Sequence, residues 1–273
     1  MDILFSHVSI VTMDERMSVW VDAFLGVTDG KIAYIGKNAP EEKPERILDG
    51  AGMVLMPGLV NCHTHLPMSL LRGYGEELPL SEWLSRSIFP QEERMDARSV
   101  KAAALLSIAE CLRFGVTSVS DMYFCSDAVA EAVAESGIKA HLCHAVTTDR
   151  TDDFDPDTDP DFREGEALHD KWHGYDGRIR VDCGIHAEYT STYPAWEALS
   201  KYALENGLGM QLHLSETKQE QEDCEERSGL TPAQLLDCHH LFDVRTQAAH
   251  CVHLTQEDMR LLARRRVSAA HRP

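Results

Sequence analysis

The pattern of apolar and polar positions divides the chain into two parts. Residues 1–57 consist of short apolar runs separated by turns. One run alternates apolar and polar side chains, and two others flank the sequence Thr28-Asp29-Gly30-Lys31. An Asp-Gly pair between two such runs is a strong signal for a β-hairpin. The pattern predicts a small antiparallel β module without helices over residues 1–57, as the N-terminal part of a β-sandwich-like domain.

From Gly58 onward, apolar runs of strand length alternate with segments of helical periodicity. Such alternation is typical of an α/β fold in which helices cover a parallel sheet. Seven units in succession favour a (β/α)8 TIM-type barrel lacking its eighth strand over residues 58–273, and an open sheet is the alternative. A complete barrel needs about 250 residues, more than this segment offers. The predicted strands occupy residues 58–65, 116–122, 139–146, 180–187, 209–216, 246–253 and 267–273, and the clearest helices residues 99–115, 127–137, 195–207 and 255–266.

Charge and composition narrow the functional classes. The chain has 26 Lys and Arg against 45 Asp and Glu, a net charge of −19 that argues against a nucleic-acid partner. Much of the acidic excess lies in residues 149–166, where we expect a solvated loop. The sequence has neither the apolar run of a membrane span nor the pattern of a secretory signal. Its eight cysteines include no Cys-x-x-Cys pair, so we expect free thiols and a cytoplasmic protein.

Histidines gather near the ends of the predicted strands, where parallel barrels carry their active sites. His63 and His65 are one residue apart, so on a strand both imidazoles lie on one face and can reach one metal ion. His213 lies within an apolar run, where an unpaired buried histidine would be costly, and is the natural third ligand. Imidazoles suit a divalent ion, with Zn²⁺ as the first choice and Fe²⁺ as the alternative.

Two further residues are candidates for chemistry beside this site. Glu216 follows His213 by three residues, where the strand gives way to a loop. A carboxylate beside a metal-activated water can move protons between that water and a leaving amine. His250, at the end of the next apolar run, could hydrogen-bond the substrate or the hydroxide. The competing interpretations are a solvated glutamate and a core histidine.

Five motifs occur in order along the chain: VLMPGLVNCHTHLPMSLLRG, GVTSVSDMYF, GIHAEYTSTY, LHLSETKQE and AAHCVHL. On these motifs the chain resembles the amidohydrolase superfamily, and within it the 5-methylthioadenosine/S-adenosylhomocysteine deaminases. The likeness runs from end to end of the chain. It implies hydrolytic deamination of an adenine nucleoside to the inosine product and ammonia by a metal-activated hydroxide. The implied substrates are 5-methylthioadenosine, S-adenosylhomocysteine and adenosine.

The resemblance also implies roles for individual residues. It implies a single metal ion bound by three histidines, which are His63, His65 and His213. Glu216 matches a residue that handles protons at the purine ring, and His250 one that orients the hydroxide. Glu92 matches a residue that binds the ribose hydroxyls, His186 a substrate-binding histidine and Trp83 an aromatic residue near the substrate.

The chain departs from this family at two points. His144 stands where members often carry an arginine that faces the homocysteine carboxylate, so 5-methylthioadenosine and adenosine stay candidates. The family continues through an eighth strand with an aspartate ligand, for which we find no counterpart. Two alternatives therefore stay open: another amidohydrolase, such as a guanine deaminase or a chlorohydrolase-like enzyme, and a catalytically silent truncated fragment. The expected partner is a small purine nucleoside, without nucleic acid or membrane, and assembly into a homo-oligomer is compatible with the sequence.

Overall fold

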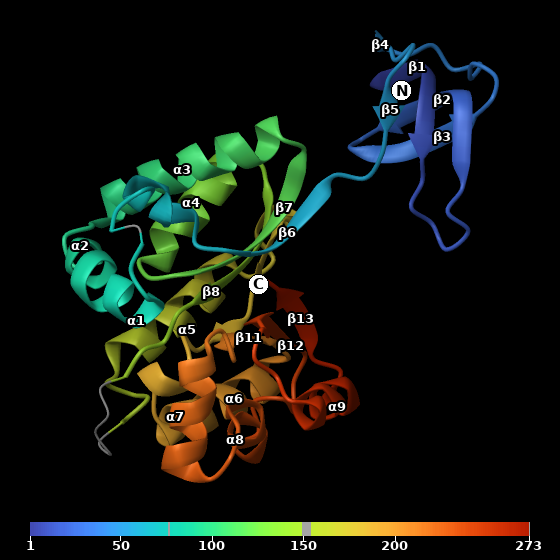
Figure 1. Ribbon diagram of the computed structural model, residues 1–273. Coiled ribbons are helices and arrows are strands. Elements are labelled where there is room, and N and C mark those ends of the chain that lie inside the picture. Colours follow the sequence, from blue (N-terminus) through green and yellow to red (C-terminus); the bar gives the residue numbers. More distant parts are fainter. Residues whose placement is uncertain (76, 149–153, 273) are drawn as a thin grey trace. The chain divides into compact units, whose positions relative to one another are not determined.

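The computed structural model describes residues 1–75, 77–148 and 154–272 and divides the chain into two units, Met1–Leu59 and Val60–Pro273 (Figure 1). The smaller unit is a sheet with the strand order β3-β2-β1-β4, in which β5 also pairs with β1. Its strands are β1 Ile3–Val11, β2 Val19–Thr28, β3 Lys31–Gly36, β4 Arg46–Asp49 and β5 Val54–Leu55.

The predicted hairpin is formed by β2 and β3. β2 ends at Thr28 and β3 begins at Lys31, and the two residues between them, Asp29 and Gly30, have positive φ angles of 50° and 69°. A type I′ turn requires this conformation at both central positions. β1 pairs with β2 antiparallel but with β4 and β5 in parallel. The expectation of a purely antiparallel module is therefore wrong, because alternation along a short strand does not specify the direction of its neighbour.

In the larger unit, each of the seven predicted runs contains a strand. The ladders that join β7 to β8 and β8 to β9 are parallel, as are those from β10 through β13. The larger unit therefore has the α/β architecture that the sequence predicts. Its strands are β6 Leu59–Thr64, β7 Val116–Tyr123, β8 Lys139–His144, β9 Ile179–Val181, β10 Cys183–Gly184, β11 Met210–Leu214, β12 Thr246–His250 and β13 Ser268–His271.

The sheets β6-β7-β8-β9 and β10-β11-β12-β13 are joined at Asp182, between β9 and β10. The backbone nitrogen of Asp182 donates to the carbonyl oxygen of Leu142 at 2.9 Å, and beyond it Val146 forms a parallel bridge with Ile185. β8 and the residues that follow it therefore pair with the chain both before and after Asp182, so β9 and β10 occupy one strand position. Seven strand positions thus run in one continuous order from β6 to β13.

This order of strands is strongly curved. β12 lies five positions from β6, which would be about 24 Å in a flat sheet. The side chain of Gln247 on β12 nevertheless donates to the carbonyl oxygen of Cys62 on β6 at 2.5 Å. No backbone ladder joins β13 to β6 among the residues that the structure describes, but Nη1 of Arg272 donates to the carbonyl oxygen of His63 at 2.7 Å. β12 and the residue that follows β13 therefore both lie close to β6.

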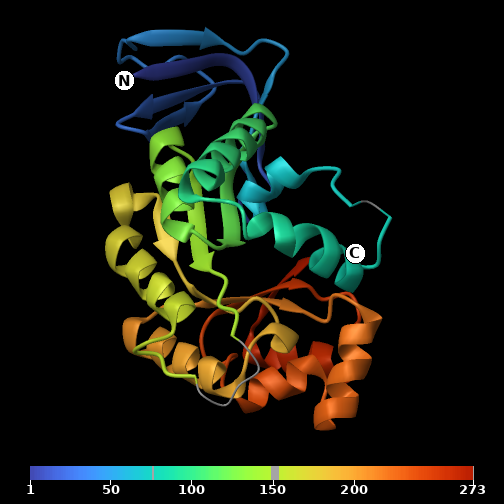
Figure 2. The same ribbon diagram turned by 90° about the vertical axis from the view of Figure 1, so that its left-hand side faces the viewer.

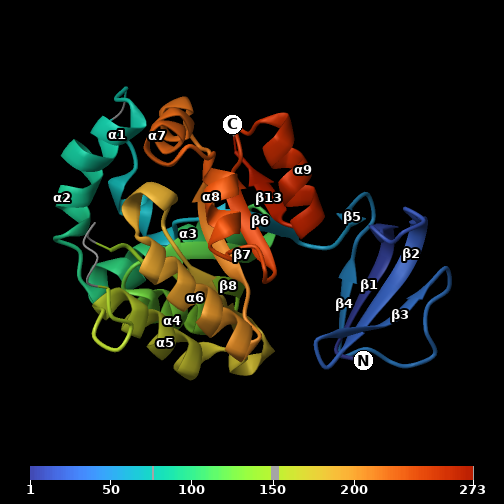
Figure 3. The same cartoon turned by 90° about the horizontal axis from the view of Figure 1, so that it is seen from below.

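Helices cover the outside of these strands. Figure 2 shows α3 and α4 side by side against β7 and β8, and Figure 3 shows α5 next to α4. The predicted helix stops at Gly137 and Gly207 are present, with positive φ angles of 82° and 67° that suit glycine. The helices are α1 Leu80–Trp83, α2 Phe89–Glu92, α3 Ala97–Arg113, α4 Ser126–Ser136, α5 Pro160–Trp172, α6 Tyr193–Asn206, α7 Lys218–Ser228, α8 Pro232–Cys238 and α9 Gln256–Arg265.

The expectation of a loop over residues 149–166 is wrong from Pro160 onward, where α5 begins. Residues 149–153 of that segment lie outside the described residues. The carboxylate of Asp159 accepts a hydrogen bond from the backbone nitrogen of Phe162 at 2.8 Å and so caps the helix. An aspartate followed by proline is itself a signal for a helix start. The high density of acidic residues concealed that signal.

All eight cysteines lie within the described residues and are unpaired, which confirms the expectation of free thiols. Among the helices that the structure describes, none combines the length and apolar character required to cross a membrane.

Candidate metal centre

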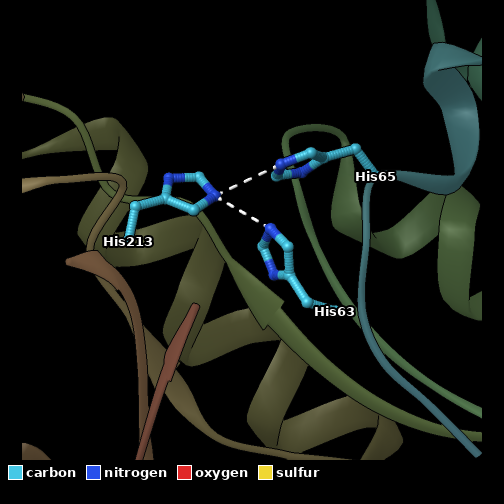
Figure 4. A group of neighbouring side chains, drawn as sticks. All are labelled: His63, His65 and His213. Carbon is cyan, nitrogen blue, oxygen red and sulfur yellow. Dashed lines mark hydrogen bonds between the residues drawn. The ribbon is translucent and has the colours of Figure 1, made fainter. Parts of the chain in front are cut away.

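Three histidine side chains converge at the carboxyl ends of β6 and β11 (Figure 4). His63 lies on β6, His65 follows that strand directly, and His213 lies on β11. Nε2 of His213 is 3.1 Å from Nε2 of His63 and 3.2 Å from Nε2 of His65. These are the three residues that the sequence singles out as metal ligands, and the structure brings them together.

The surroundings of these imidazoles favour their neutral forms. Burial lowers the pKa of His63 to about 2 and that of His213 well below its usual value, and the neighbouring histidines add to both effects. Nδ1 of His65 lies 2.6 Å from the carbonyl oxygen of Met122. Because a carbonyl oxygen can only accept, Nδ1 carries the proton and Nε2 of His65 keeps a free electron pair. The ring is therefore held in the form that binds metals.

The donor set fits a divalent first-row cation. Nε2 of His65 offers an electron pair, and neutral His63 and His213 can each present an unprotonated Nε2 to the same point. A tetrahedral zinc site with Zn–N bonds of about 2.0–2.1 Å implies N···N separations of roughly 3.3–3.4 Å, close to the two observed distances. Imidazole nitrogen suits Zn²⁺ and Fe²⁺ alike. Three protein ligands are also the number found in catalytic zinc sites, which keep one position open.

Glu216 and His250 lie together beside this centre. His250 ends β12, and its ring centroid is 5.3 Å from that of His63 and 5.1 Å from that of His213. Nε2 of His250 lies 3.6 Å from Oε2 of Glu216. Burial, followed by the charge of Glu220, raises the pKa of Glu216 to about 7, and burial lowers that of His250 to about 4. Near neutral pH the carboxyl group of Glu216 can therefore both accept and release a proton.

The two candidate substrate-binding residues differ in their connection to the centre. The ring centroid of His186 is 4.8 Å from that of His213, and burial lowers its pKa to about 4. Glu92, on α2, accepts a hydrogen bond from the hydroxyl of Tyr123 at 2.7 Å. The ring of Tyr123 lies 6.3 Å from that of His65. Tyr123, which the sequence did not indicate as a site residue, thus lies between Glu92 and His65.

Trp83 and Arg272 line a cavity that reaches the metal centre at His65. The cavity has a volume of about 660 Å³, and Trp83, Arg272 and His65 are among the residues that line it. The indole nitrogen of Trp83 donates to the carbonyl oxygen of Tyr74 at 2.9 Å. Trp83, the aromatic residue indicated by the sequence, therefore lines the same cavity as the candidate ligand His65.

His144 does not join the centre, although it also ends a strand. It is buried, with Nε2 3.4 Å from Asp161 and Nδ1 3.5 Å from Glu164. Burial alone would lower its pKa, but the two nearby carboxylates outweigh burial and raise the pKa to about 9. The charge of His144 is therefore matched within the protein by two acidic side chains of α5.

Asp121 is a second residue that the sequence analysis missed. It lies on β7, is 2% exposed, and its Oδ1 accepts hydrogen bonds from Thr64 and Leu66. Burial raises its pKa to about 7. The available signal was a carboxylate within the otherwise uncharged strand segment VTSVSDMY, since a buried charge needs partners.

Comparison with known proteins points to one family. Residues 54–273 match the model of the amidohydrolase family. The chain is 36% identical over 274 residues to the 5-methylthioadenosine/S-adenosylhomocysteine deaminase of Thermoanaerobacter pseudethanolicus. This match covers 100% of the present chain and 63% of that protein. It is 42% identical over 243 residues to the protein of the same name from Dictyoglomus thermophilum, covering 89% of this chain and 56% of that protein. The chain thus spans about three fifths of the length of these curated relatives.

A solved structure gives the same picture. The chain is similar to the zinc-bound crystal structure of an adenosine deaminase from Xanthomonas campestris, with a TM-score of 0.91 and 32% sequence identity. The similarity covers 100% of this chain and 62% of that chain.

Proposed function

Because the chain belongs to the amidohydrolase family, we propose that it acts in the hydrolytic deamination of an adenine nucleoside. The reaction consumes the nucleoside and one water and yields the hypoxanthine nucleoside and ammonia. The observation that carries the proposal is the convergence of His63, His65 and His213 beside Glu216. The names of the relatives, which are deaminases of methylthioadenosine, S-adenosylhomocysteine and adenosine, support the substrate class.

The proposed cofactor is one divalent ion, Zn²⁺ before Fe²⁺, held by the Nε2 atoms of His63, His65 and His213. When bound, such an ion supplies the Lewis acidity that makes a water molecule reactive at neutral pH. β6 and β11 carry His63 and His213, and His65 follows β6 directly. The hydrogen bond from His65 to Met122 fixes the protonation of one of them in advance.

Glu216 is the proposed proton carrier. Its pKa of about 7 means that the carboxylate and the carboxylic acid are both populated at neutral pH. Deamination needs a group that takes a proton from water and delivers one to the purine, and Glu216 can do both. His250, 3.6 Å from this carboxyl group, is proposed to orient the attacking water by hydrogen bonding.

Glu92 and His186 are proposed to bind the nucleoside. The hydroxyl of Tyr123 donates to Oε1 of Glu92, which leaves acceptor capacity on the carboxylate for ribose hydroxyls. His186 is packed against the ligand His213 and hydrogen-bonded to Thr190 at 3.1 Å. With its low pKa, the imidazole of His186 remains uncharged and can pair with a neutral purine or sugar group.

For the fold, we propose that β6 to β13 provide seven strand positions of an eight-strand barrel. The contacts between β12 and β6 and between Arg272 and His63 support this proposal, because an open flat sheet would separate these residues. Residues 1–57 and 58–273 are the corresponding proposed domains.

The direct test is an ammonia-release assay on the purified chain loaded with Zn²⁺ or Fe²⁺. 5-Methylthioadenosine, S-adenosylhomocysteine and adenosine are supplied separately, with guanine as a substrate of a different type. We expect release of ammonia and loss of the adenine absorbance with at least one nucleoside. After removal of the metal by a chelator, or in His213→Ala, we expect neither change. Turnover of guanine alone, or no turnover of any nucleoside by the metal-loaded chain, contradicts the proposal.

A further inference from the structure

One strand holds the segment that carries two of the three candidate metal ligands. Thr64, the last residue of β6, and the two residues that follow it are hydrogen-bonded to β7. The hydroxyl of Thr64 donates to Oδ1 of Asp121 at 2.7 Å, the ring of His65 to the carbonyl oxygen of Met122 at 2.6 Å, and the backbone nitrogen of Leu66 to Oδ1 of Asp121 at 2.6 Å. The carboxylate of Asp121 thus makes the bonds on either side of His65.

The position of Thr64 makes this arrangement specific to the metal centre. Thr64 stands between His63 and His65, and side chains alternate along a strand, so it points away from the face that carries the two imidazoles. It is 8% exposed, and its hydroxyl also lies 3.0 Å from the carbonyl oxygen of Ser120. Its bond to Asp121 therefore fixes the backbone between the two ligands without occupying their side of the strand.

Metal binding is sensitive to such an attachment. A constellation of ligands must be held within about 0.5 Å of its productive geometry. His65 lies where β6 gives way to a 3-10 helix, and a strand end loses the support of its ladder there. The hydrogen bond from the backbone nitrogen of Leu66 to Asp121 holds the chain at the residue directly after His65.

We propose that Asp121 is a positioning residue for the metal centre, which holds Thr64 and Leu66 so that His63 and His65 face the same point as His213. This inference rests on the proposed metal site but not on the proposed substrate. Asp121 itself donates no atom to the three-histidine group. Its effect is exerted through the backbone that carries the ligands.

The test is the affinity of the purified chain for Co²⁺ and Zn²⁺, measured by competition with a chromophoric chelator, together with the visible spectrum of the Co²⁺ form. We expect Asp121→Leu to weaken the affinity by about 10- to 100-fold and to change the Co²⁺ bands. Asp121→Asn keeps an oxygen acceptor for both bonds, so we expect it to restore affinity to within about threefold of wild type.

The matched control is Asp182→Leu. Asp182 is also a buried carboxylate, 4% exposed, but it accepts hydrogen bonds from the backbone nitrogen of Gly209 and from Arg245, at the starts of β11 and β12. We expect this variant to lower the thermal midpoint and to bind Co²⁺ as wild type does. An equal loss of affinity in Asp182→Leu and Asp121→Leu overturns the proposal, because the effect would then be general destabilisation.

Thr64→Val provides the decision if Asp121→Leu does not fold. It removes one hydroxyl and nearly conserves volume, and we expect a loss of affinity of roughly 3- to 10-fold. Wild-type affinity and spectrum in Thr64→Val, or in a folded Asp121→Leu, overturn the proposal. The result is independent of turnover: a chain that binds Co²⁺ as expected but deaminates nothing would contradict the proposed function and leave the role of Asp121 intact.

Discussion

The imidazole of His144 lies 3.4 Å from the carboxylate of Asp161, away from the other strand-end histidines. Its pKa is about 9 in the folded chain, against about 6.5 for an unperturbed histidine. A raised pKa stabilises the fold fully below pH 6.5, and the contribution is lost as the pH rises through 9. We expect the free energy of unfolding to fall by on the order of 2–3 kcal/mol over this range.

Urea unfolding of the wild type and of His144→Gln between pH 6 and pH 10 checks this expectation. The variant cannot take up the proton, so its stability should be lower at pH 6 and should change little up to pH 9. His7→Gln is the control, since His7 is an exposed histidine of the smaller unit. An unchanged slope with pH in His144→Gln would show that the loss has another origin.

Metal binding should stabilise the chain. A ligand that binds only the folded state at 100 times its Kd adds about 2.7 kcal/mol to the free energy of unfolding. We therefore expect saturating Zn²⁺ to raise the thermal midpoint and a chelator to reverse the increase. His213→Ala should lose most of this response, whereas His7→Ala should retain it. Equal responses in the two variants would argue against the three-histidine site.

Replacing Glu216 by glutamine should separate chemistry from metal binding. The amide keeps the size of the side chain but cannot carry a proton, so we expect kcat to fall by about 10²- to 10⁴-fold with unchanged zinc affinity. Glu222→Gln is the matched control, because Glu222 is an exposed residue of α7 paired with Lys218. A Glu216→Gln variant with wild-type kcat would remove Glu216 from the mechanism.

Tyr123→Phe should act on substrate binding through Glu92. The variant removes only the hydroxyl that donates to Oε1 of Glu92 at 2.7 Å, so the carboxylate loses its fixed orientation. We expect KM for the nucleoside to rise by roughly 3- to 10-fold with little change in kcat, as for the loss of one hydrogen bond. Steady-state kinetics distinguish this from a fall in kcat alone, which would place Tyr123 in the chemical step.

Much of the candidate site was predictable because its candidate ligands have a local signature. His63 and His65 are two residues apart on one strand, and the period of a strand places them on one face whatever the rest of the fold does. His213 required the order of the strands as well. It lies four strand positions from His63, and only the curvature of the sheet brings their Nε2 atoms to 3.1 Å.

The supporting residues were not predictable in the same way. The proposed roles of Asp121 and Tyr123 depend on their contacts with Thr64 and Glu92. These partners lie on other elements, and no periodic sequence pattern relates them to Asp121 and Tyr123. The parallel pairing of β4 with β1 was not predictable either, because the sequence of a short strand does not specify the direction of the strand beside it. Local patterns therefore predicted the elements and the candidate ligands, whereas the residues proposed to orient them are identified only by contacts between distant segments.

The interruption at Asp182 would give a bound metal ion a mechanical role. β6, with His63 and His65, belongs to the sheet on one side of this point, and β11, with His213, belongs to the sheet on the other. His63 and His213 are 150 residues apart in sequence. An ion bound by both would be a reversible cross-link between distant parts of the chain. Because it binds the folded state, it would tie the two halves of the sheet together there.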